Sequence, residues 1–263
     1  MSDTKLSRRD FLKYAGLAGG GLLVVELFGT GAVSPLNPSN AVAGDTAKEA
    51  QSKHKWVMVI DQSKCIGCNF CTYACKACND IPGDAQWNTV SVEGSTDKGP
   101  AYLPRPCQHC ENAPCVEACP VGATYHRADG LVEMDYAKCI GCRYCEVACP
   151  YNARVFNWQD PAKLANSYVP EWGTPDIPRR KRGVVEKCTF CAQRIDRGLA
   201  EGLTPGVDRD ATPACVNVCP VRARLFGDFY DPTSPASRAL AQHRSFRLRE
   251  DLGTNPRVYY LPA

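Results

Sequence analysis

The sequence lacks the short motifs that hold the common organic cofactors. No glycine-rich dinucleotide fingerprint follows a predicted strand, and no phosphate-binding P-loop is present. No C-x2-C pair is followed by histidine, which argues against covalent haem. The 4 histidines are too few and too scattered for a second metal system, and no acid–base pair is evident. These absences argue against an enzyme with a catalytic site of its own.

Long apolar runs are also scarce. Nothing after Val33 is apolar for long enough to span a bilayer, so we expect the mature part to be soluble or docked to a partner. The formal charge is +3 at pH 7 with every cysteine counted as neutral. Thiolate-bound metal clusters would make the holoprotein acidic, and the sequence offers no basis for a nucleic-acid-binding surface.

Cysteine, in contrast, is abundant, with 17 residues. The stretch Cys139–Pro150 reads C-x2-C-x2-C-x3-C-P, the spacing by which bacterial ferredoxins hold [4Fe-4S] clusters. Its first three thiolates wrap one cluster, and the fourth ligates a neighbouring one. Pro150 turns the chain off the short helix that precedes it. The run is too dense for a zinc site, which needs two separated pairs of ligands.

The pattern occurs four times, with two extra residues before the third cysteine of the second copy and a 23-residue insertion in the last copy. Together the four motifs use 16 of the 17 cysteines, enough for four [4Fe-4S] clusters. They are motif one (Cys65, Cys68, Cys71, Cys75), motif two (Cys107, Cys110, Cys115, Cys119), motif three (Cys139, Cys142, Cys145, Cys149) and motif four (Cys188, Cys191, Cys215, Cys219).

Two alternatives concern the use of these cysteines. A disulfide scaffold is the ordinary alternative for an exported cysteine-rich chain, but the odd count and the close spacing argue against it. Cys78 is left over, three residues past Cys75, and is the alternative ligand at that position. His109, inside motif two, would be surplus as a ligand, and we expect it to tune a nearby cluster by hydrogen bonding.

The first 43 residues have the form of a twin-arginine (Tat) export signal. Arg8-Arg9 precedes an apolar stretch from Tyr14 to Val33, and Ala41-Val42-Ala43 has the form of a cleavage site. Residues 1–43 are therefore predicted to be a signal peptide and the mature protein to be periplasmic, peripheral to the membrane. A chance arginine pair before a membrane helix, or a signal kept as an anchor, is the alternative.

Local patterns predict an α+β fold of ferredoxin-like modules, in which strand, cluster loop, one-turn helix and returning strand follow one another. Gly67 and Gly141 are expected where the chain bends closely round a cluster. After the 23-residue insertion, which begins amphipathic and becomes turn-rich, we expect a C-terminal helix and an edge strand. The predicted strands and final elements are Trp56–Ile60, Trp87–Val92, Leu131–Met134, Thr124-Tyr125, Arg154–Phe156, Arg224–Phe226, the helix Ser234–His243 and the strand Val258–Leu261. The basic run Arg179–Arg182 is expected to be a solvated turn or, alternatively, a docking loop for an acidic partner.

The chain resembles the four-cluster iron–sulfur subunits of the dimethyl sulfoxide reductase type. The resemblance rests on the four motifs, the Tat-like signal and the C-terminal segment that begins Phe226-Gly227-Asp228 and ends near Tyr260-Leu261. The iron–sulfur (beta) chains of polysulfide and tetrathionate reductases are of this type, as is the exported iron–sulfur chain of the sulfite-reductase-associated membrane complex. The resemblance covers residues 55–263. It implies a protein that transfers electrons between a quinone-reactive membrane protein and a catalytic subunit, often one with molybdopterin.

The resemblance also implies a nested organisation. An outer ferredoxin-like module would comprise residues 55–106 plus 186–230, and an inner one residues 107–157. Residues 158–185 would form a Pro-rich basic loop and residues 231–263 a C-terminal helix and strand. Each fourth cysteine would cross to the partner motif, giving cluster 1 (Cys65, Cys68, Cys71, Cys219), cluster 2 (Cys107, Cys110, Cys115, Cys149), cluster 3 (Cys119, Cys139, Cys142, Cys145) and cluster 4 (Cys75, Cys188, Cys191, Cys215).

The sequence contains one feature that favours the nested pairing of the motifs and one that favours a different pairing. Only 19 residues separate Cys119 from Cys139, against 31 between Cys75 and Cys107, which favours pairing motif two with motif three. Motif one resembles motif three, however, and motif two resembles motif four, as if a two-motif unit had been duplicated, which would most simply pair motif one with two and motif three with four.

Three other functions compete with electron transfer between fixed partners: an iron–sulfur subunit of a sulfite-reductase-associated complex without molybdenum, a free periplasmic polyferredoxin, and an enzyme in its own right.

Export should depend on the arginine pair. We expect that replacing both residues by lysine (Arg8→Lys with Arg9→Lys) leaves the clusters assembled but the protein in the cytoplasm, because the pathway that the signal resembles carries folded proteins. Cell fractionation with iron analysis of each fraction measures this. Normal periplasmic accumulation of a chain expressed without its partners would contradict the export prediction.

Overall fold

The computed structural model describes residues 52–263 apart from residues 84 and 98. The chain divides into two units, residues 1–48 and 49–263, and all of the described residues belong to the second. The predicted export signal, with Arg8 and Arg9, lies outside the described residues. Within the described part of the chain, no helix combines the length and the apolar character needed to cross a membrane.

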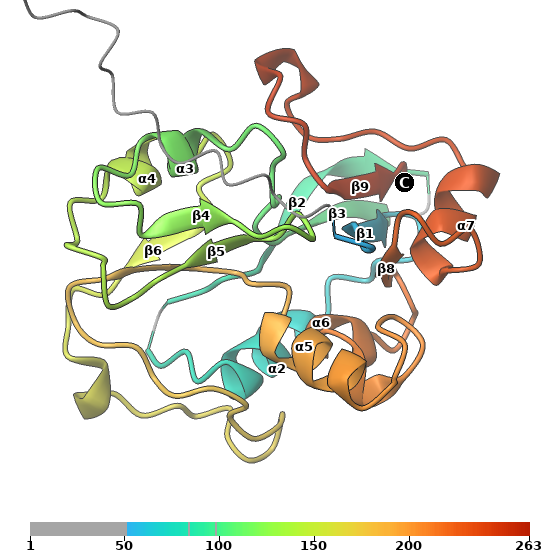
Figure 1. The fold of residues 1–263 in the computed structure, drawn as a ribbon. Coiled ribbons are helices and arrows are strands. Elements are labelled where there is room, and N and C mark those ends of the chain that lie inside the picture. Colours follow the sequence, from blue (N-terminus) through green and yellow to red (C-terminus); the bar gives the residue numbers. More distant parts are fainter. Residues whose placement is uncertain (1–51, 84, 98) are drawn as a thin grey trace, which may run out of the picture. The chain divides into compact units, whose positions relative to one another are not determined.

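In the described part of the chain, short strands form one three-stranded sheet and three two-stranded ribbons (Figure 1). Most of them lie directly before or after a cysteine motif. In chain order they are β1 (Trp56–Asp61), β2 (Thr89–Thr96), β3 (Gly99–Arg105), β4 (Thr124–His126), β5 (Val132–Met134), β6 (Arg154–Phe156), β7 (Val185–Lys187), β8 (Arg224–Asp228) and β9 (Val258–Leu261).

The strand pairing follows one rule throughout the described residues. The strand after each motif pairs antiparallel with the strand before the next motif, as β2 with β3, β4 with β5, and β6 with β7. β8, which follows the last motif, pairs with β1, which precedes the first, with Ile60 opposite Arg224. β9 adds to the other edge of β1 in parallel, as the expected edge strand. The last strands of the described part of the chain therefore pair with its first strand.

In residues 52–263, apart from 84 and 98, the helices belong to two groups. Three single-turn helices lie inside motifs two, three and four: α3 (Pro114–Glu117), α4 (Tyr144–Val147) and α6 (Ala214–Asn217). Three longer helices are α2 (Phe70–Cys78), α5 (Ala192–Ala200) and α7 (Pro235–Gln242). Short 3₁₀ turns occur at Pro161–Lys163, Arg209–Ala211 and Glu250–Leu252. The one-turn helix expected in motif one is wrong in length, since α2 runs for 9 residues.

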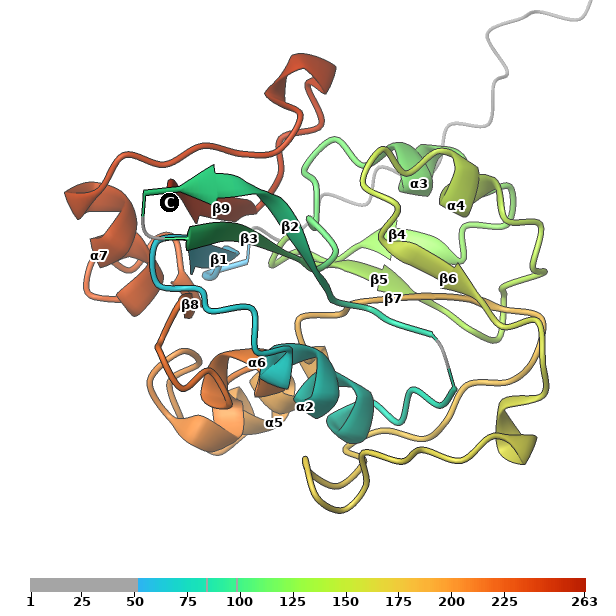
Figure 2. The same ribbon diagram turned by 180° about the vertical axis from the view of Figure 1, so that it is seen from behind.

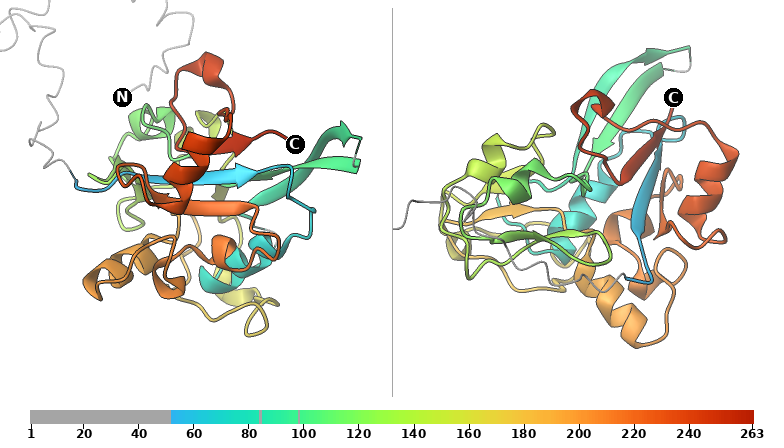
Figure 3. Two further views of the ribbon diagram at one scale, coloured as in Figure 1. Left: turned by 90° about the vertical axis from the view of Figure 1, so that its right-hand side faces the viewer. Right: turned by 45° about the horizontal axis from the view of Figure 1, so that its top comes forward.

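The C-terminal helix begins as the sequence predicts. The Ser234 hydroxyl accepts a hydrogen bond from the Ser237 N–H at 3.2 Å, and Pro235 occupies the first helical position. The insertion in motif four is expected to begin amphipathic and to become turn-rich, and it consists of α5 followed by turns. The predicted strand Trp87–Val92 is shifted to β2, which pairs with β3 as a hairpin that projects from the body (Figure 3). Its outer half is exposed.

Seen from either side, strands β4, β5 and β6 with helices α3 and α4 lie together, whereas β1 lies beside β8 and β9 (Figures 1 and 2). Helix α2 packs against α6, and α3 packs against α4. The first and last parts of the described chain are thus neighbours, and its middle part forms a separate group of elements.

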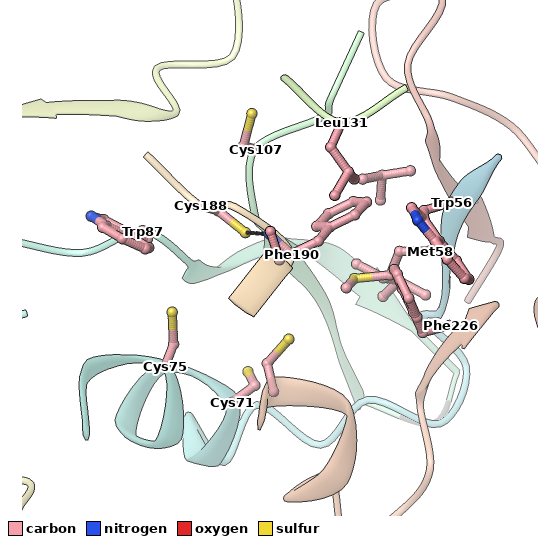
Figure 4. Packing of buried hydrophobic residues seen from close by; sticks show 14 of the residues in the cluster. Trp56, Met58, Cys71, Cys75, Trp87, Cys107, Leu131, Cys188, Phe190 and Phe226 are labelled. Atoms are coloured by element: carbon pink, nitrogen blue, oxygen red, sulfur yellow. Dashed lines mark hydrogen bonds between the residues drawn. The ribbon is translucent and has the colours of Figure 1, made fainter. Parts of the chain in front are cut away.

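The core is built around thiols rather than around a large aliphatic cluster. Its main buried group joins aromatic residues of β1 and β8 with cysteines from motifs one, two and four. Trp56 stacks on Phe226, which meets Phe190 edge-on (Figure 4). Cys71 and Cys75 project from α2 toward the region that holds Cys188 (Figure 4). Burying so many thiols stabilises the fold only if their polar sulfur atoms find partners.

The expectation that Arg179–Arg182 forms a solvated turn or a docking loop is wrong for its first half. Arg180 is buried, and its Nη2 lies 3.0 Å from Glu186 Oε2. Arg179 Nη2 lies 2.7 Å from Asp80 Oδ1. These arginines hold the loop against the end of α2 and against β7, and only Lys181 and Arg182 are exposed.

Candidate metal-cluster sites

One cavity collects three cysteines of motif one and the last cysteine of motif four. We call it site 1, and its cysteines are Cys65, Cys68, Cys71 and Cys219. Gly67, in its wall, has a φ of 70°, and a Cβ atom there would stand 2.3 Å from the Tyr102 ring. A backbone in this conformation, so close to its neighbours, favours glycine, as the sequence predicts for Gly67.

A second cavity repeats this arrangement with motifs two and three. We call it site 3, and its cysteines are Cys119, Cys139, Cys142 and Cys145. Gly141 has a φ of 73°, and a Cβ atom would meet the Gly183 carbonyl oxygen at 2.3 Å. The correspondence of Gly67 and Gly141 shows that the two cavities are built by the same local backbone.

The remaining eight motif cysteines form two interior groups. Site 2 comprises Cys107, Cys110, Cys115 and Cys149, and site 4 comprises Cys75, Cys188, Cys191 and Cys215. Burial, followed by the neighbouring thiols of the same site, raises the pKa of Cys110 to about 12. Burial and then Cys188, Cys191 and Cys215 raise the pKa of Cys75 well above its usual value. Within each site the four sulfur atoms are close enough to oppose one another's ionisation.

Backbone N–H groups point at several of these sulfur atoms. The N–H of Ala123 donates to Cys119 Sγ, and that of Ala223 donates to Cys219 Sγ, both at 3.2 Å. Partial burial opposes ionisation of Cys119, but backbone hydrogen bonds outweigh it and lower its pKa. Donors of this kind favour thiolates, the form in which cysteine binds metal.

These residues fit polynuclear clusters better than single ions. Among the described residues, no group of three or more His, Cys, Asp or Glu side chains is arranged to hold one metal ion. The thiols instead surround cavities, and burial raises the pKa of several, including Cys215 to about 12. Such thiols need a cationic centre to ionise, which the iron of a cluster would supply. Each cluster, when bound, would accept and release one electron.

Cys78 borders site 4, because it packs in one small buried cluster with Cys191, and its thiol and that of Cys215 oppose each other's ionisation. Asn79 Nδ2 donates to the sulfur atoms of Cys75 and Cys191, at 3.7 and 3.6 Å, which holds Cys75 within the site. Cys78 packs at the end of α2, and a Cβ atom on Gly173 would stand 3.0 Å from its sulfur. This geometry favours Cys75 over Cys78 as the ligand.

His109 is a core residue with one satisfied nitrogen. Its Nδ1 accepts a hydrogen bond from the Val132 N–H at 3.1 Å, and its ring lies 3.9 Å from that of Phe190. Its Nε2 has no partner among the described residues. Burial lowers the pKa of His109 well below the usual range, so the ring is neutral and carries its proton on Nε2. Its role in tuning a cluster stays a prediction.

Sequence reasoning missed the polar side chains that surround the thiols. Asn88 Nδ2 donates to Cys71 Sγ at 3.3 Å, and Arg224 Nη1 donates to Cys215 Sγ at 3.7 Å. Arg154 is buried beside the thiols of site 2. One signal was available, because Arg154 and Arg224 each stand five residues after the fourth cysteine of a motif.

Comparison with protein families agrees with this geometry. Models of the 4Fe-4S dicluster domain match residues 100–165 and 138–223, and a model of the 4Fe-4S binding domain matches residues 56–77. The chain is therefore a ferredoxin-like iron–sulfur protein.

Its relatives define the family more closely. The chain is 46% identical to a Halobacterium salinarum protein assigned as a dimethyl sulfoxide reductase iron–sulfur subunit, with 78% of each chain covered. It is 43% identical to the menaquinone reductase iron–sulfur cluster-binding subunit of Nitratidesulfovibrio vulgaris, covering 80% of this chain and 89% of that protein. It is 33% identical to the first iron–sulfur subunit of the Hdr-like menaquinol oxidoreductase of Archaeoglobus fulgidus, over 97% of each.

The chain belongs to the family of iron–sulfur subunits found in dimethyl sulfoxide, tetrathionate and polysulfide reductases. Members of this family are electron-transfer subunits of reductase complexes, and the resemblance seen in the motifs is confirmed.

The backbone of site 3 provides a direct test of the cavity. We expect Gly141→Ala to lower the iron content by one cluster, since its methyl group would collide with the Gly183 carbonyl. Gly122→Ala is the matched control, because Gly122 also has a positive φ, 61°, but open space around it. That control should cost only about 1 kcal/mol of stability. Equal iron in the two variants, by metal analysis, would contradict the assignment of site 3.

Proposed function

We propose that this chain binds four [4Fe-4S] clusters and is the electron-transfer subunit of an exported respiratory oxidoreductase complex, with no catalytic site of its own. The observation that carries the proposal is the gathering of 16 cysteines, from four motifs, into four groups of four. Sites 1 to 4 would each hold one cluster, with the sixteen cysteines as ligands.

The proposed ligand sets are nested, with motif one paired with four and motif two with three. In support, Cys219 lines site 1 with motif one, and Cys119 lines site 3 with motif three. The pairing of β1 with β8 and the packing of α2 on α6 bring the two ends of the described chain together. The hairpin of β4 and β5 with the packing of α3 on α4 joins motifs two and three.

The sites follow one another in the order 3, 2, 4, 1. Cys145 of site 3 lies near Cys115 of site 2, Cys107 of site 2 near Cys188 of site 4, and Cys215 of site 4 near Cys71 of site 1. Both ends of the series approach the surface, since Cys142 of site 3 is exposed and Cys65 of site 1 is half-buried. A single row with two accessible ends suits a protein that takes electrons from one partner and delivers them to another.

The proposed partners are a quinone-reactive membrane protein and a catalytic subunit, in many such complexes one with molybdopterin. Two relatives carry menaquinone or menaquinol in their names, and others are named for dimethyl sulfoxide or tetrathionate reductases. A second candidate is the iron–sulfur subunit of a quinol-linked membrane complex without molybdenum, such as the sulfite-reductase-associated one. The match to the Archaeoglobus protein, over 97% of each chain, supports the quinol link of this candidate, because that protein is named for a menaquinol oxidoreductase. The Tat-like signal would place either complex at the periplasmic face.

Iron analysis tests the number of clusters, and substitution of single cysteine ligands by serine tests which motifs share a cluster. We expect about 16 iron atoms per chain after anaerobic purification. Cys219→Ser should alter the spectroscopic signature of the cluster at site 1, whereas Cys119→Ser, the matched change in motif two, should alter that at site 3. An effect of Cys119→Ser on the cluster held by Cys65, Cys68 and Cys71 would contradict the nested pairing, and iron at about half the expected content would contradict four clusters.

Partner binding separates a fixed subunit from a diffusing carrier. We expect the tagged chain, extracted with mild detergent from its native cells, to copurify with an integral membrane protein and a larger soluble subunit. Mass spectrometry identifies both. Recovery of the fully iron-loaded chain alone from the periplasmic fraction would support the free polyferredoxin instead.

A further inference from the structure

Three basic side chains are buried in the core without a carboxylate partner. They are Lys187, Arg154 and Arg224, with exposed fractions of 0%, 5% and 2%. None of them forms an ion pair with a carboxylate of the residues that the structure describes. A buried charge is costly unless an opposite charge compensates it. Burial raises the pKa of the nearby Glu133 to about 7, although Lys187 opposes the rise, so this carboxyl compensates Lys187 only in part. The rest of the compensating charge, and all of it for Arg154 and Arg224, must come from the thiolates and what they bind.

Arg154 lies between sites 2 and 3. Its Nη1 donates to Thr124 Oγ1 at 3.2 Å and to Met134 Sδ at 3.1 Å, and both of these residues line the cavity of site 3. Burial lowers the pKa of Arg154, but the thiols of Cys115 in site 2 and Cys145 in site 3 more than reverse this. The guanidinium group therefore faces two sites at once.

Arg224 stands in the same way between sites 4 and 1. It lines the cavity of site 1, and its Nη1 donates to Cys215 Sγ of site 4 at 3.7 Å. Its Nη2 donates to Asn88, whose own amide donates to Cys71 Sγ of site 1 at 3.3 Å. Because both arginines begin a strand five residues after a fourth cysteine, the fold places them equivalently.

Lys187 lies between the remaining neighbours, sites 2 and 4. It ends β7 next to Cys188, and its Nζ donates to the Cys188 carbonyl oxygen at 2.7 Å. Its charge also acts on the thiol of Cys107 in site 2. In the register of β6 and β7, Lys187 is directly opposite Arg154. Like charges in that position repel, so this buried pair requires negative charge beside it.

We infer that Arg154, Lys187 and Arg224 each stand between two consecutive clusters and raise the reduction potentials of both. This inference rests on the proposed function. The resulting order is site 3, Arg154, site 2, Lys187, site 4, Arg224, site 1. Reduction adds one negative charge to a cluster, and a fixed cation in a poorly screened interior stabilises that charge. The three residues are positioning residues for electron transfer and touch no substrate.

The sequence supplies a matched control for Lys187. Lys64, Lys138 and Lys187 all directly precede the first cysteine of a motif. Lys138 pairs with Asp135 and is 62% exposed, whereas Lys187 has Val184 in place of that aspartate and is fully buried. Lys187→Gln and Lys138→Gln therefore remove the same charge at the same place in a motif, once in the interior and once in solvent.

The test is a potentiometric titration of the complete, anaerobically purified chain, followed by electron paramagnetic resonance. At a fixed potential, we expect Lys187→Gln to lower the ratio of reduced to oxidised cluster about tenfold at sites 2 and 4, which is about 59 mV for one electron. Sites 1 and 3 should shift less, and Lys138→Gln should leave all four potentials nearly unchanged. Equal shifts in both variants, or no shift at sites 2 and 4, would overturn the inference.

Two variants of Arg154 distinguish the effect of its positive charge from the effect of its shape. Arg154→Gln should lower the potentials at sites 2 and 3, and Arg154→Lys, which keeps the charge, should restore most of the difference. If the glutamine variant loses iron, retention of iron in the lysine variant supports a need for charge, and loss in both overturns the inference. A wild-type chain with fewer than four clusters would instead refute the proposed function, so the two failures are distinguishable.

Discussion

The interaction on which this fold depends is the bond between buried thiolates and metal. Without it, the interior would hold two groups of mutually repelling sulfur atoms, at sites 2 and 4, and three buried cations without a carboxylate ion pair. The rest of the core combines the aromatic contacts among Trp56, Phe190 and Phe226 with aliphatic side chains that lie in separate clusters around the thiols. The strands are short because each needs only to lead the chain into one cysteine loop and out again. Cluster binding and folding should therefore be a single cooperative event.

The cysteine spacing also explains the order of the elements. A motif that gives three ligands to one site and the fourth to its neighbour obliges two motifs to stand face to face. The packing of α2 on α6 and the pairing of β1 with β8 bring together segments from opposite ends of the described chain. In the proposed arrangement, closing the chain in this way would produce a row of sites with two accessible ends, which is the property that an electron-transfer protein needs.

Features set by local sequence were predictable, and features set by distant packing were not. The spacing of the cysteines, the close bends at Gly67 and Gly141 and the capped helix at Ser234 depend on neighbouring residues, and the structure has them. The burial of Arg180 could not be foreseen, because Trp87 and Asn79 complete its environment from far along the chain. Lys187 looks like Lys64 and Lys138 in sequence. It differs because β7 carries it into the core opposite Arg154.

The central claim is that four clusters lie in one row, joined by crossing ligands, with a buried cation between each neighbouring pair. Anomalous scattering at the iron absorption edge, from crystals of the anaerobic protein, tests it most directly. The account predicts four separate iron peaks in the order of sites 3, 2, 4 and 1, with the Cys219 sulfur bonded to the iron at site 1 and Lys187 between the two middle peaks. Fewer than four peaks, or Cys119 bonded to the cluster of Cys65, Cys68 and Cys71, would contradict it.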